Sequence, residues 1–325
     1  MTKPLVVSLL AANALFAAPA VLSAERWDMP TEQSQSSLTG VANLFFAQAV
    51  SERTGGAITI RVHFGGALGY RSTDQYDAVS TGAVVLADSY TGPLVGHNPI
   101  WQVSALPFLT SGIEDARRLY EAARPTYEAI LKADGQLLLY TIPWTPSGIW
   151  SRRPIRTPAD LAGLRIRTFD PLGQATFAAA GARPRTLPFI DVVPQLTTGG
   201  IEAALTSAEG GFQNRFTDLL DHFTIINYAS PLSIVHMNRA VWDRLPEAHR
   251  AALAAAAAET EAMIWARAVA REAEVLEQMR AKGTKIIEAS PELLELLRNS
   301  AKSAIAGWLE RTGERGAAIL AAYRR

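Results

Sequence analysis

Residues 159–169 read Ala159-Asp160-Leu161-Ala162-Gly163-Leu164-Arg165-Ile166-Arg167-Thr168-Phe169. The run predicts a turn that ends a helix and leads into a short strand, because alternating residues follow the glycine. One face of this strand carries Leu164, Ile166 and Thr168, and the other carries Arg165, Arg167 and Phe169. The segment therefore predicts a strand with two arginines on one side.

Arg167 is the candidate binding residue of this strand. A guanidinium near the end of a buried strand stays charged, and its planar fork matches a carboxylate through two parallel hydrogen bonds. Arg165 lies toward the start of the strand, so we expect it in solvent or in a salt bridge. The alternative role for Arg167 is an ion pair inside the domain. Together with an export signal, Arg167 suggests capture of small organic acids outside the cytoplasm.

The N-terminal quarter of the chain predicts a βαβαβ order, which is typical of α/β domains with ligand loops beyond the strand ends. The expected segments are strand Arg26–Pro30, helix Leu38–Arg53, strand Ile58–Phe64, helix Ser72–Thr81 and a buried parallel strand Ala83–Ala87. Helical and strand-like segments alternate further along the chain. The interpretation is an α/β fold.

Later segments predict how two domains are joined. We expect crossovers near Trp144–Ile149 and Ala229–Pro231, where proline and glycine interrupt the pattern. Residues 246–282 have a helical pattern throughout and would extend roughly 55 Å at 1.5 Å per residue. A helix of that length is longer than one small domain needs, so we expect it to pack along both.

Residues 1–24 have the pattern of a secretory signal peptide, with cleavage after Ala20 or Ala24. An uncleaved membrane anchor is the alternative, but the apolar core is short for a span. The chain holds 31 basic and 31 acidic residues, so its net charge does not favour nucleic acid as a partner. It has no cysteine, which excludes disulfides and thiolate metal sites.

Catalytic motifs are absent from the sequence. The five histidines have no metal-ligand spacing, and there is no nucleophile elbow or phosphate-binding glycine loop. We therefore expect no enzyme activity, no metal and no cofactor. An exported enzyme acting on small organic acids remains the alternative from a different class.

Several aromatic and polar residues follow predicted strands and are candidate pocket residues. Trp144 would supply a large apolar wall. Residues 201–211 form a strand that runs into small and polar positions, where Thr206, Ser207 or Glu209 could contact the far end of a ligand.

The chain resembles the DctP-type solute-binding proteins of TRAP (tripartite ATP-independent periplasmic) transporters. The order and spacing of several motifs carry the resemblance over most of the chain after the signal segment. These motifs are Gly66-Ala67-Leu68-Gly69, the Gly82 turn, Leu106-Pro107-Phe108-Leu109, Asp160-Leu161-Ala162-Gly163-Leu164-Arg165-Ile166-Arg167, Trp242-Asp243-Arg244-Leu245-Pro246 and the long helix.

The resemblance implies a periplasmic two-lobed clamshell with mixed sheets, whose cleft closes on its ligand. Lobe I would comprise 25–145 and about 230–260, lobe II about 146–229 and 265–325, and helix 246–282 would span both. It implies a monomer that delivers its ligand to a small and a large membrane subunit. The binding component of an ATP-driven importer is an alternative, which the long helix disfavours.

The resemblance also implies ligand contacts. The carboxylate-pairing arginine of the family matches Arg167, and ligand-contacting positions match Tyr70, Tyr90 and Phe189. Sialic-acid-binding members carry a second arginine about where Ser147 stands, and their Asn-Pro is replaced here by Thr206-Ser207. We therefore expect a compact monocarboxylate, aromatic or branched, in place of a sugar acid.

Overall fold

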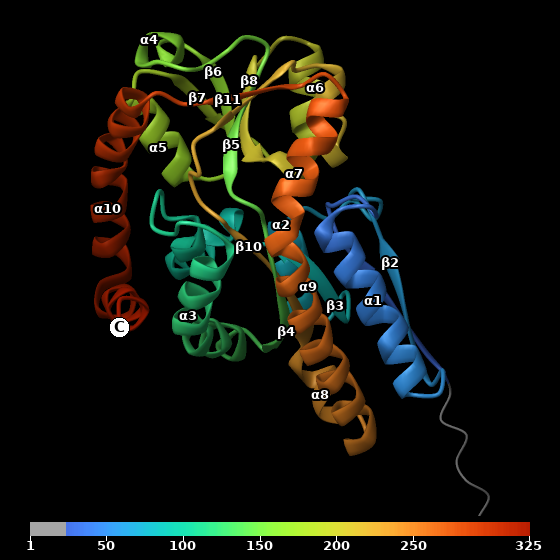
Figure 1. The fold of residues 1–325 in the computed structure, drawn as a ribbon. Helices are drawn as coiled ribbons and strands as arrows, with labels where there is room; N and C mark the ends of the chain where they lie inside the picture. Colours follow the sequence, from blue (N-terminus) through green and yellow to red (C-terminus); the bar gives the residue numbers. More distant parts are fainter. Residues whose placement is uncertain (1–23) are drawn as a thin grey trace, which may run out of the picture.

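The computed structural model describes residues 24–325, so the predicted signal segment lies outside the described residues except for Ala24. These residues form two lobes, one above the other in Figure 1, with a long helix along one side. Each lobe has its own sheet and its own buried apolar core. The fold is the mixed α/β clamshell that the sequence predicts.

Lobe I contains five strands, of which β3, β10 and β4 form one antiparallel sheet and β1 and β2 a parallel pair. A parallel bridge between Thr31 and Asp88 joins the pair to β3. The strands are β1 (Glu25–Pro30), β2 (Ile58–His63), β3 (Leu86–Tyr90), β4 (Gln136–Pro143) and β10 (Leu232–Asn238).

Helices cover the faces of this sheet and bury its apolar side chains. Phe46, Trp101, Tyr127 and Trp265 belong to one core cluster that extends through the lobe. The helices of lobe I are α1 (Leu38–Arg53), α2 (Ser72–Thr81), η1 (Gly92–Gly96), η2 (Pro99–Ala105), α3 (Ile113–Ala133) and α8 (Arg239–Arg244). The predicted bounds of α1 and α2 are confirmed, and α2 ends at Gly82, whose φ of 78° suits a glycine.

Lobe II is built on a six-stranded mixed sheet with the order β11-β9-β5-β8-β6-β7. The strands are β5 (Ser147–Ser151), β6 (Arg165–Thr168), β7 (Arg183–Thr186), β8 (Ala203–Ser207), β9 (His222–Ile225) and β11 (Lys285–Glu288). The helices are α4 (Pro158–Leu161), α5 (Pro171–Ala179), η3 (Phe189–Asp191), α6 (Val192–Thr197), α7 (Ala208–Gln213) and η4 (Phe216–Asp218). β6 lies inside the sheet, so its residues are buried from Ile166 onward.

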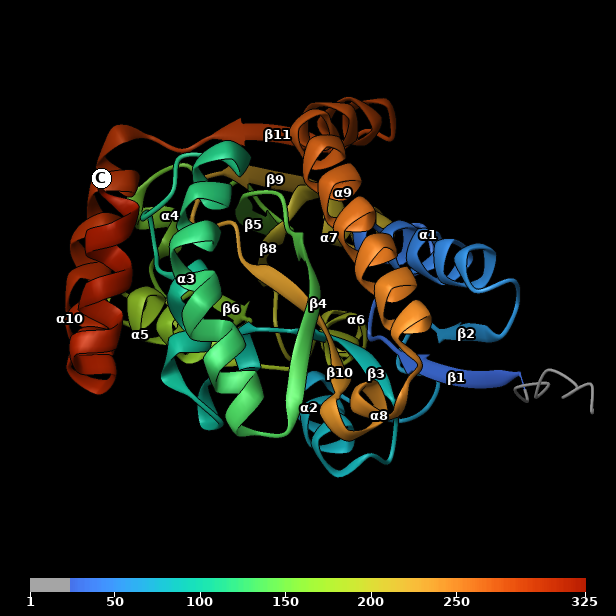
Figure 2. The ribbon, with the colours of Figure 1, turned by 90° about the horizontal axis from the view of Figure 1, so that it is seen from below.

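Helix α9 (Glu247–Ala281) connects the two lobes, as the sequence predicts. Its N-terminal half packs into the core of lobe I through Leu253 and Ile264, and its C-terminal half packs into lobe II through Val275 and Met279. Figure 2 shows α9 crossing beside α1 and α7. The helix is therefore a rigid edge along which both lobes are aligned.

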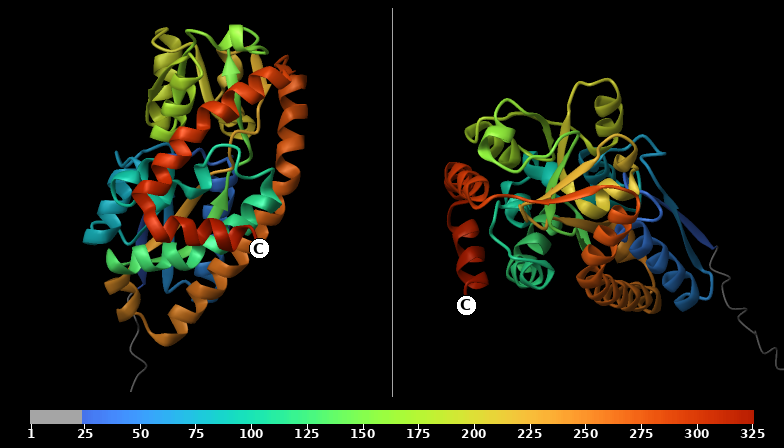
Figure 3. Two further views of the ribbon diagram at one scale, coloured as in Figure 1. Left: turned by 90° about the vertical axis from the view of Figure 1, so that its left-hand side faces the viewer. Right: turned by 45° about the horizontal axis from the view of Figure 1, so that its top comes forward.

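Helix α10 (Pro291–Tyr323) departs from the expected domain boundary. Leu293 and Leu297 pack on lobe II, whereas Trp308 and Leu320 belong to the core of lobe I. A kink at Gly313, where φ is 55°, turns its C-terminal part sharply, as Figure 3 shows. The C-terminal segment thus fastens both lobes and does not belong to lobe II alone.

Two chain segments pass side by side between the lobes. The Trp144 amide donates to the Pro231 carbonyl, and the Ser147 amide donates to the Ala229 carbonyl, each at 2.9 Å. These bonds make an antiparallel pair of crossovers, at the two places where the sequence predicts them. A narrow pair of backbone-bonded segments is a suitable hinge for relative motion of two lobes.

Three strands differ from the sequence-based expectation. The third strand is Leu86–Tyr90 and not Ala83–Ala87, and its main neighbour β10 is antiparallel. Ser147–Ser151, which was expected to be a connection, forms strand β5 in the middle of the lobe II sheet. The polar strand Arg183–Thr186 was not predicted, because edge strands with one exposed face lack the apolar signal.

Candidate ligand-binding site

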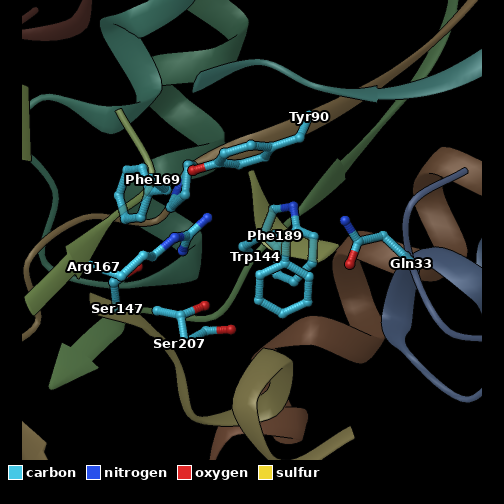
Figure 4. Close-up of a pocket in the computed structure, with 10 residues that line it drawn as sticks. Gln33, Tyr90, Trp144, Ser147, Arg167, Phe169, Phe189 and Ser207 are labelled. Carbon is cyan, nitrogen blue, oxygen red and sulfur yellow. The ribbon is translucent and has the colours of Figure 1, made fainter. Parts of the chain in front are cut away.

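A cavity lies between the two lobes at the ends of strands from both sheets. Its empty volume is about 330 Å3, including the space at its mouth. Figure 4 shows its lining residues converging from both lobes. The lining residues are Gln33, Tyr90, Trp144, Ser147, Arg167, Phe169, Phe189, Thr206, Ser207 and Pro231.

Arg167 reaches the cavity from the third position of β6, and its residue is only 3% exposed. Its Nε donates to the Leu187 carbonyl at 3.0 Å, and its Nη1 donates to the Leu205 carbonyl at 3.2 Å. These two bonds to backbone carbonyls fix the guanidinium plane. No described residue accepts from Nη2 within hydrogen-bond distance, so this nitrogen is available to a ligand.

The charge of Arg167 is buried without a direct counter-ion. Among residues 24–325, no carboxylate lies within 4.0 Å of its guanidinium. Burial lowers the pKa of Arg167 to about 10, although the charges of Tyr90, Glu32 and Asp170 oppose the decrease. The side chain is therefore charged at neutral pH, and an anion in the cavity would relieve the cost of its burial.

Arg165 has the role that the sequence predicts for it. Its side chain is 50% exposed and forms an ion pair with Glu202 at 3.1 Å. The two arginines thus differ in burial although they are two residues apart on one strand. The alternative for Arg167, an ion pair inside the domain, finds no partner among the described side chains.

Four aromatic rings form the apolar walls of the cavity. The Tyr90 ring meets Trp144 and Phe169 edge to face, with centroids 5.9 and 5.8 Å apart. The guanidinium of Arg167 lies 5.6 Å from the centroid of Phe189. Aromatic rings around a buried cation exclude water and strengthen its attraction for an anion.

Hydroxyl groups and one amide complete the lining. Ser207 lies where β8 meets α7, and its hydroxyl accepts from the Gly210 amide at 3.0 Å. Ser147 is paired with Ser207 across β5 and β8, Thr206 is paired with Gly148, and the Ser147 and Thr206 side chains are both buried. Gln33 enters from lobe I, and its buried Oε1 has no hydrogen-bond partner among the described residues. The site can therefore accept from and donate to a polar ligand body.

Two predicted site residues lie elsewhere. Tyr70 precedes α2, does not line the cavity, and uses its backbone carbonyl to accept from Gln75. Glu209 does not line it either: its carboxylate is 1% exposed and accepts from the Leu38 amide. The structure thus brings together six of the predicted side chains, namely Arg167, Trp144, Tyr90, Phe189, Thr206 and Ser207.

Sequence reasoning did not assign Gln33, Ser147 or Pro231 to the lining, whereas Phe169 was among the aromatic residues at strand ends that were considered for an apolar pocket. Gln33 follows the first strand, and a polar residue just beyond a strand end is the signal that could have identified it. Ser147 was treated as a connection residue because β5 was not expected. Phe169 follows β6 directly, two positions after Arg167.

A second recess of about 670 Å3 adjoins this cavity and shares Tyr90, Arg167, Phe169 and Phe189 with it. Glu32 and Arg71 line its outer part. Arg71 is half-exposed and is paired with Asp191 of lobe II at 3.4 Å. The recess is the continuation of the interlobe cleft toward solvent.

Within the described part of the chain, no group of three or more histidine, aspartate and glutamate residues has the geometry of a metal site. No helix among residues 24–325 has the length and apolar character needed to cross a bilayer. The features that remain at the site are one buried cation, four aromatic walls and neutral polar groups. These features define a binding site for a small anion between two lobes.

Comparison with protein families identifies this class. A family model described as bacterial extracellular solute-binding protein, family 7 (DctP), matches residues 29–311. The chain belongs to this family. The predicted resemblance to DctP-type solute-binding proteins of TRAP transporters is thereby confirmed.

Individual relatives agree with the family. The 2,3-diketo-L-gulonate-binding periplasmic protein of Escherichia coli is 28% identical, with 73% of each chain covered. The Bordetella pertussis receptor DctP7, which binds pyroglutamic acid, is 28% identical with a TM-score of 0.89, and the match covers 93% of this chain and 100% of that one. A marine metagenome TRAP receptor specific for pyroglutamate is 28% identical with a TM-score of 0.88, covering 93% and 99%.

Proposed function

We propose that this protein is the periplasmic receptor of a TRAP transporter, and that it captures a compact monocarboxylate through Arg167. The observation that carries the proposal is the buried guanidinium, which is oriented by two carbonyls and has no carboxylate partner among the described residues. A ligand carboxylate facing Nη2 would complete its hydrogen bonding. The pairing would be charge-assisted and desolvated, which makes it strong.

The number of cations in the cavity favours one carboxylate per ligand. Arg167 is the one arginine among the residues that line it, and they include no lysine or histidine. A second carboxylate in the same volume would be desolvated beside aromatic rings without a counter-charge, at a high free-energy cost. Dicarboxylates are therefore disfavoured.

The size and chemistry of the cavity favour a small body with a few polar atoms. Its empty space of about 330 Å3 includes the open mouth, so the enclosed part between the aromatic walls leaves room only for a compact ligand. Gln33, Ser147 and Thr206 supply neutral polar groups for a hydroxyl, carbonyl or amide. L-Pyroglutamate combines a carboxylate with a compact lactam, and relatives at 28% identity bind this acid.

Isothermal titration calorimetry with four probes tests the proposal. L-Pyroglutamate and 2-oxoisovalerate represent compact monocarboxylates, succinate adds a second carboxylate, and 2-pyrrolidinone is pyroglutamate without its carboxylate. We expect binding of at least one monocarboxylate and none of 2-pyrrolidinone. Tighter binding of succinate would contradict the preference for a single carboxylate, and equal binding of 2-pyrrolidinone would contradict the carboxylate clamp.

Two further observations separate the receptor from the alternatives. A receptor returns its ligand chemically unchanged after prolonged incubation, whereas an enzyme acting on small acids produces a new compound. Delivery to TRAP membrane subunits predicts that genes for a small and a large membrane protein adjoin this gene without an ATPase gene. An adjacent ATPase gene would instead indicate an ATP-driven importer.

A further inference from the structure

Glu209 forms a buried contact between the lobes, away from the ligand cavity. It lies on α7 of lobe II, and its carboxylate is 1% exposed. Its Oε1 accepts a hydrogen bond from the Leu38 amide at 3.0 Å and lies 3.8 Å from Nε of Arg271. Figure 2 shows the ribbons of α1, α7 and α9, which carry these three residues, near one another.

The partners of this carboxylate belong to different parts of the molecule. Leu38 is the first residue of α1 and is buried in the core of lobe I. Ala208, next to Glu209, and Val275, one turn after Arg271, are buried in the core of lobe II. Arg271 lies on α9 between Ala268 of the lobe I core and Val275 of the lobe II core, whereas the bond from the Leu38 amide to Glu209 joins α1 of lobe I to α7 of lobe II.

The end of α1 is a suitable partner for a carboxylate. The first amides of a helix have no partner inside the helix, and they give its N-terminus a partial positive charge. The Ser37 hydroxyl accepts from the Gly40 amide within lobe I, whereas the Leu38 amide donates to the Glu209 carboxylate of lobe II. Arg271 is only 9% exposed and keeps the Glu209 carboxylate in place.

We propose that Glu209 is a positioning residue that latches the closed form: it binds the N-terminus of α1 when the lobes meet and slows ligand release without touching the ligand. Separation of the lobes would break the bond to Leu38 and leave the pair with Arg271 intact. The inference rests on the receptor function, since closure around a ligand is what the latch stabilises.

Two other contacts between the lobes are exposed and serve as comparisons. The Ser36 hydroxyl donates to Oε1 of Gln213 at 2.6 Å on the surface. Arg71 and Asp191 are 49% and 40% exposed and 3.4 Å apart. Exposed contacts of this kind contribute little to the stability of the closed form, because water competes for the same groups. Gln213→Ala is therefore a matched control on the same helix as Glu209.

The experiment measures the release of L-pyroglutamate by stopped-flow fluorescence of the tryptophans, one of which lines the cavity. For Glu209→Ala we expect release about 10- to 100-fold faster, the equivalent of one hydrogen bond to a charged group. Glu209→Gln keeps an acceptor for Leu38 but loses the charge, so release should increase by only about two- to fivefold. Association should stay close to wild type, as should release from Gln213→Ala. The Tm of ligand-free Glu209→Ala should fall, because Arg271 loses a buried partner, whereas that of Glu209→Gln should change less.

A distance measurement tests closure directly. The chain has no cysteine, so Gln48→Cys on α1 and Thr197→Cys on α6, both exposed, can each carry one spin label. With ligand bound, Glu209→Ala should show a larger fraction of long distances than the doubly labelled parent. A structural role confined to lobe II would lower the Tm and leave this distribution unchanged.

The outcomes separate the latch from the proposed ligand. Release at the wild-type rate from both Glu209 variants would overturn the latch, as would a loss of Tm with unchanged release. If Glu209→Ala fails to fold, Glu209→Gln and the label distances decide. If the wild-type protein does not bind L-pyroglutamate, the proposed ligand is wrong, and the variants are compared with 2-oxoisovalerate or the panel acid that does bind.

Discussion

The two lobes contribute different chemistry to the cleft. Lobe II supplies the buried cation Arg167 and the hydroxyls of Thr206 and Ser207, all on parallel neighbours of one sheet. Lobe I supplies Tyr90, an aromatic wall, and Gln33, a neutral amide. A ligand that first pairs with Arg167 would be covered by lobe I as the cleft closes. If Arg167 binds the ligand as proposed, lobe II selects the charge of the ligand, and lobe I determines how completely that charge is shielded from water.

Removal of the Arg167 charge of lobe II should have the largest effect on ligand affinity. Arg167→Ala is expected to weaken binding about 30- to 4,000-fold, because truncation of one partner of a buried charge pair costs roughly 2–5 kcal/mol. Calorimetry with the bound monocarboxylate measures the change. Arg167→Lys should also bind poorly, since a point charge does not replace the fork. Binding of Arg167→Ala within threefold of wild type would show that charge recognition does not reside there.

The two lobes should also differ in how pH affects them. Burial raises the pKa of Asp88 in lobe I to about 6 and that of Asp170 in lobe II to about 7. A carboxyl whose folded pKa exceeds its unfolded value stabilises the fold below the unfolded pKa, and this contribution is lost as pH rises through the folded pKa.

The variant Asp170→Asn tests whether stability falls as pH rises, because asparagine does not titrate. It preserves the N-terminal cap of α5, where Oδ1 of Asp170 accepts a hydrogen bond from the Gly173 amide. Between pH 4 and 7, the free energy of unfolding of the variant minus that of wild type should increase by up to about 1.4 kcal/mol per pH unit. Urea unfolding at several pH values measures it. Asp88→Asn should show the same trend but level off nearer pH 6, and a pH-independent difference would contradict the assignment.

Removal of a lobe I wall should weaken binding less than removal of the charge. Tyr90→Ala is expected to lower affinity about tenfold, through lost apolar contact with the ligand. The effect should appear mainly as faster release, because shielding develops as the cleft closes. Stopped-flow kinetics measure it, with the Tm of the ligand-free variant as a control for folding. A loss as large as that of Arg167→Ala would remove the distinction between the lobes.

The smallest effect on ligand affinity is expected for exposed charges that do not line the cavity. Arg71→Ala removes the pair with Asp191, and Arg165→Ala removes the pair with Glu202. Each should change affinity by less than about threefold, since exposed ion pairs contribute about 0–1 kcal/mol. Calorimetry under the conditions used for Arg167→Ala gives the comparison. A large effect of Arg165→Ala would show that burial does not separate the two arginines of β6.

Much of the fold follows from local patterns in the sequence. The helices Leu38–Arg53 and Ser72–Thr81 have the predicted bounds, because apolar periodicity and helix-ending glycines are local signals. β5 was missed because it lies between prolines and glycines and is stabilised by neighbours far along the chain. Strand pairing of this kind depends on tertiary contacts that a local pattern does not contain.

At the site, Arg167 could be predicted from local pattern, whereas the position of Glu209 depends on tertiary contacts. Alternation along β6 and the family motif were enough to single out Arg167, since its position relative to a strand end is encoded in its neighbours. Glu209 also follows a strand end, yet its carboxylate turns away from the cavity toward the Leu38 amide and Arg271. Those partners are 171 and 62 positions away in sequence, so only the packed lobes define them.

The sequence by itself determined the α/β class, the family and the bridging helix, and it singled out the arginine that we propose as the ligand contact. These features rest on periodicity, spacing and residue chemistry, which act over a few positions of the chain. Only the tertiary structure decided that Arg167 is buried without a carboxylate partner among the described residues while Arg165 is paired in solvent. Burial and the partners of a charge depend on what the folded chain brings around it, and the strength of a charge interaction depends on that environment.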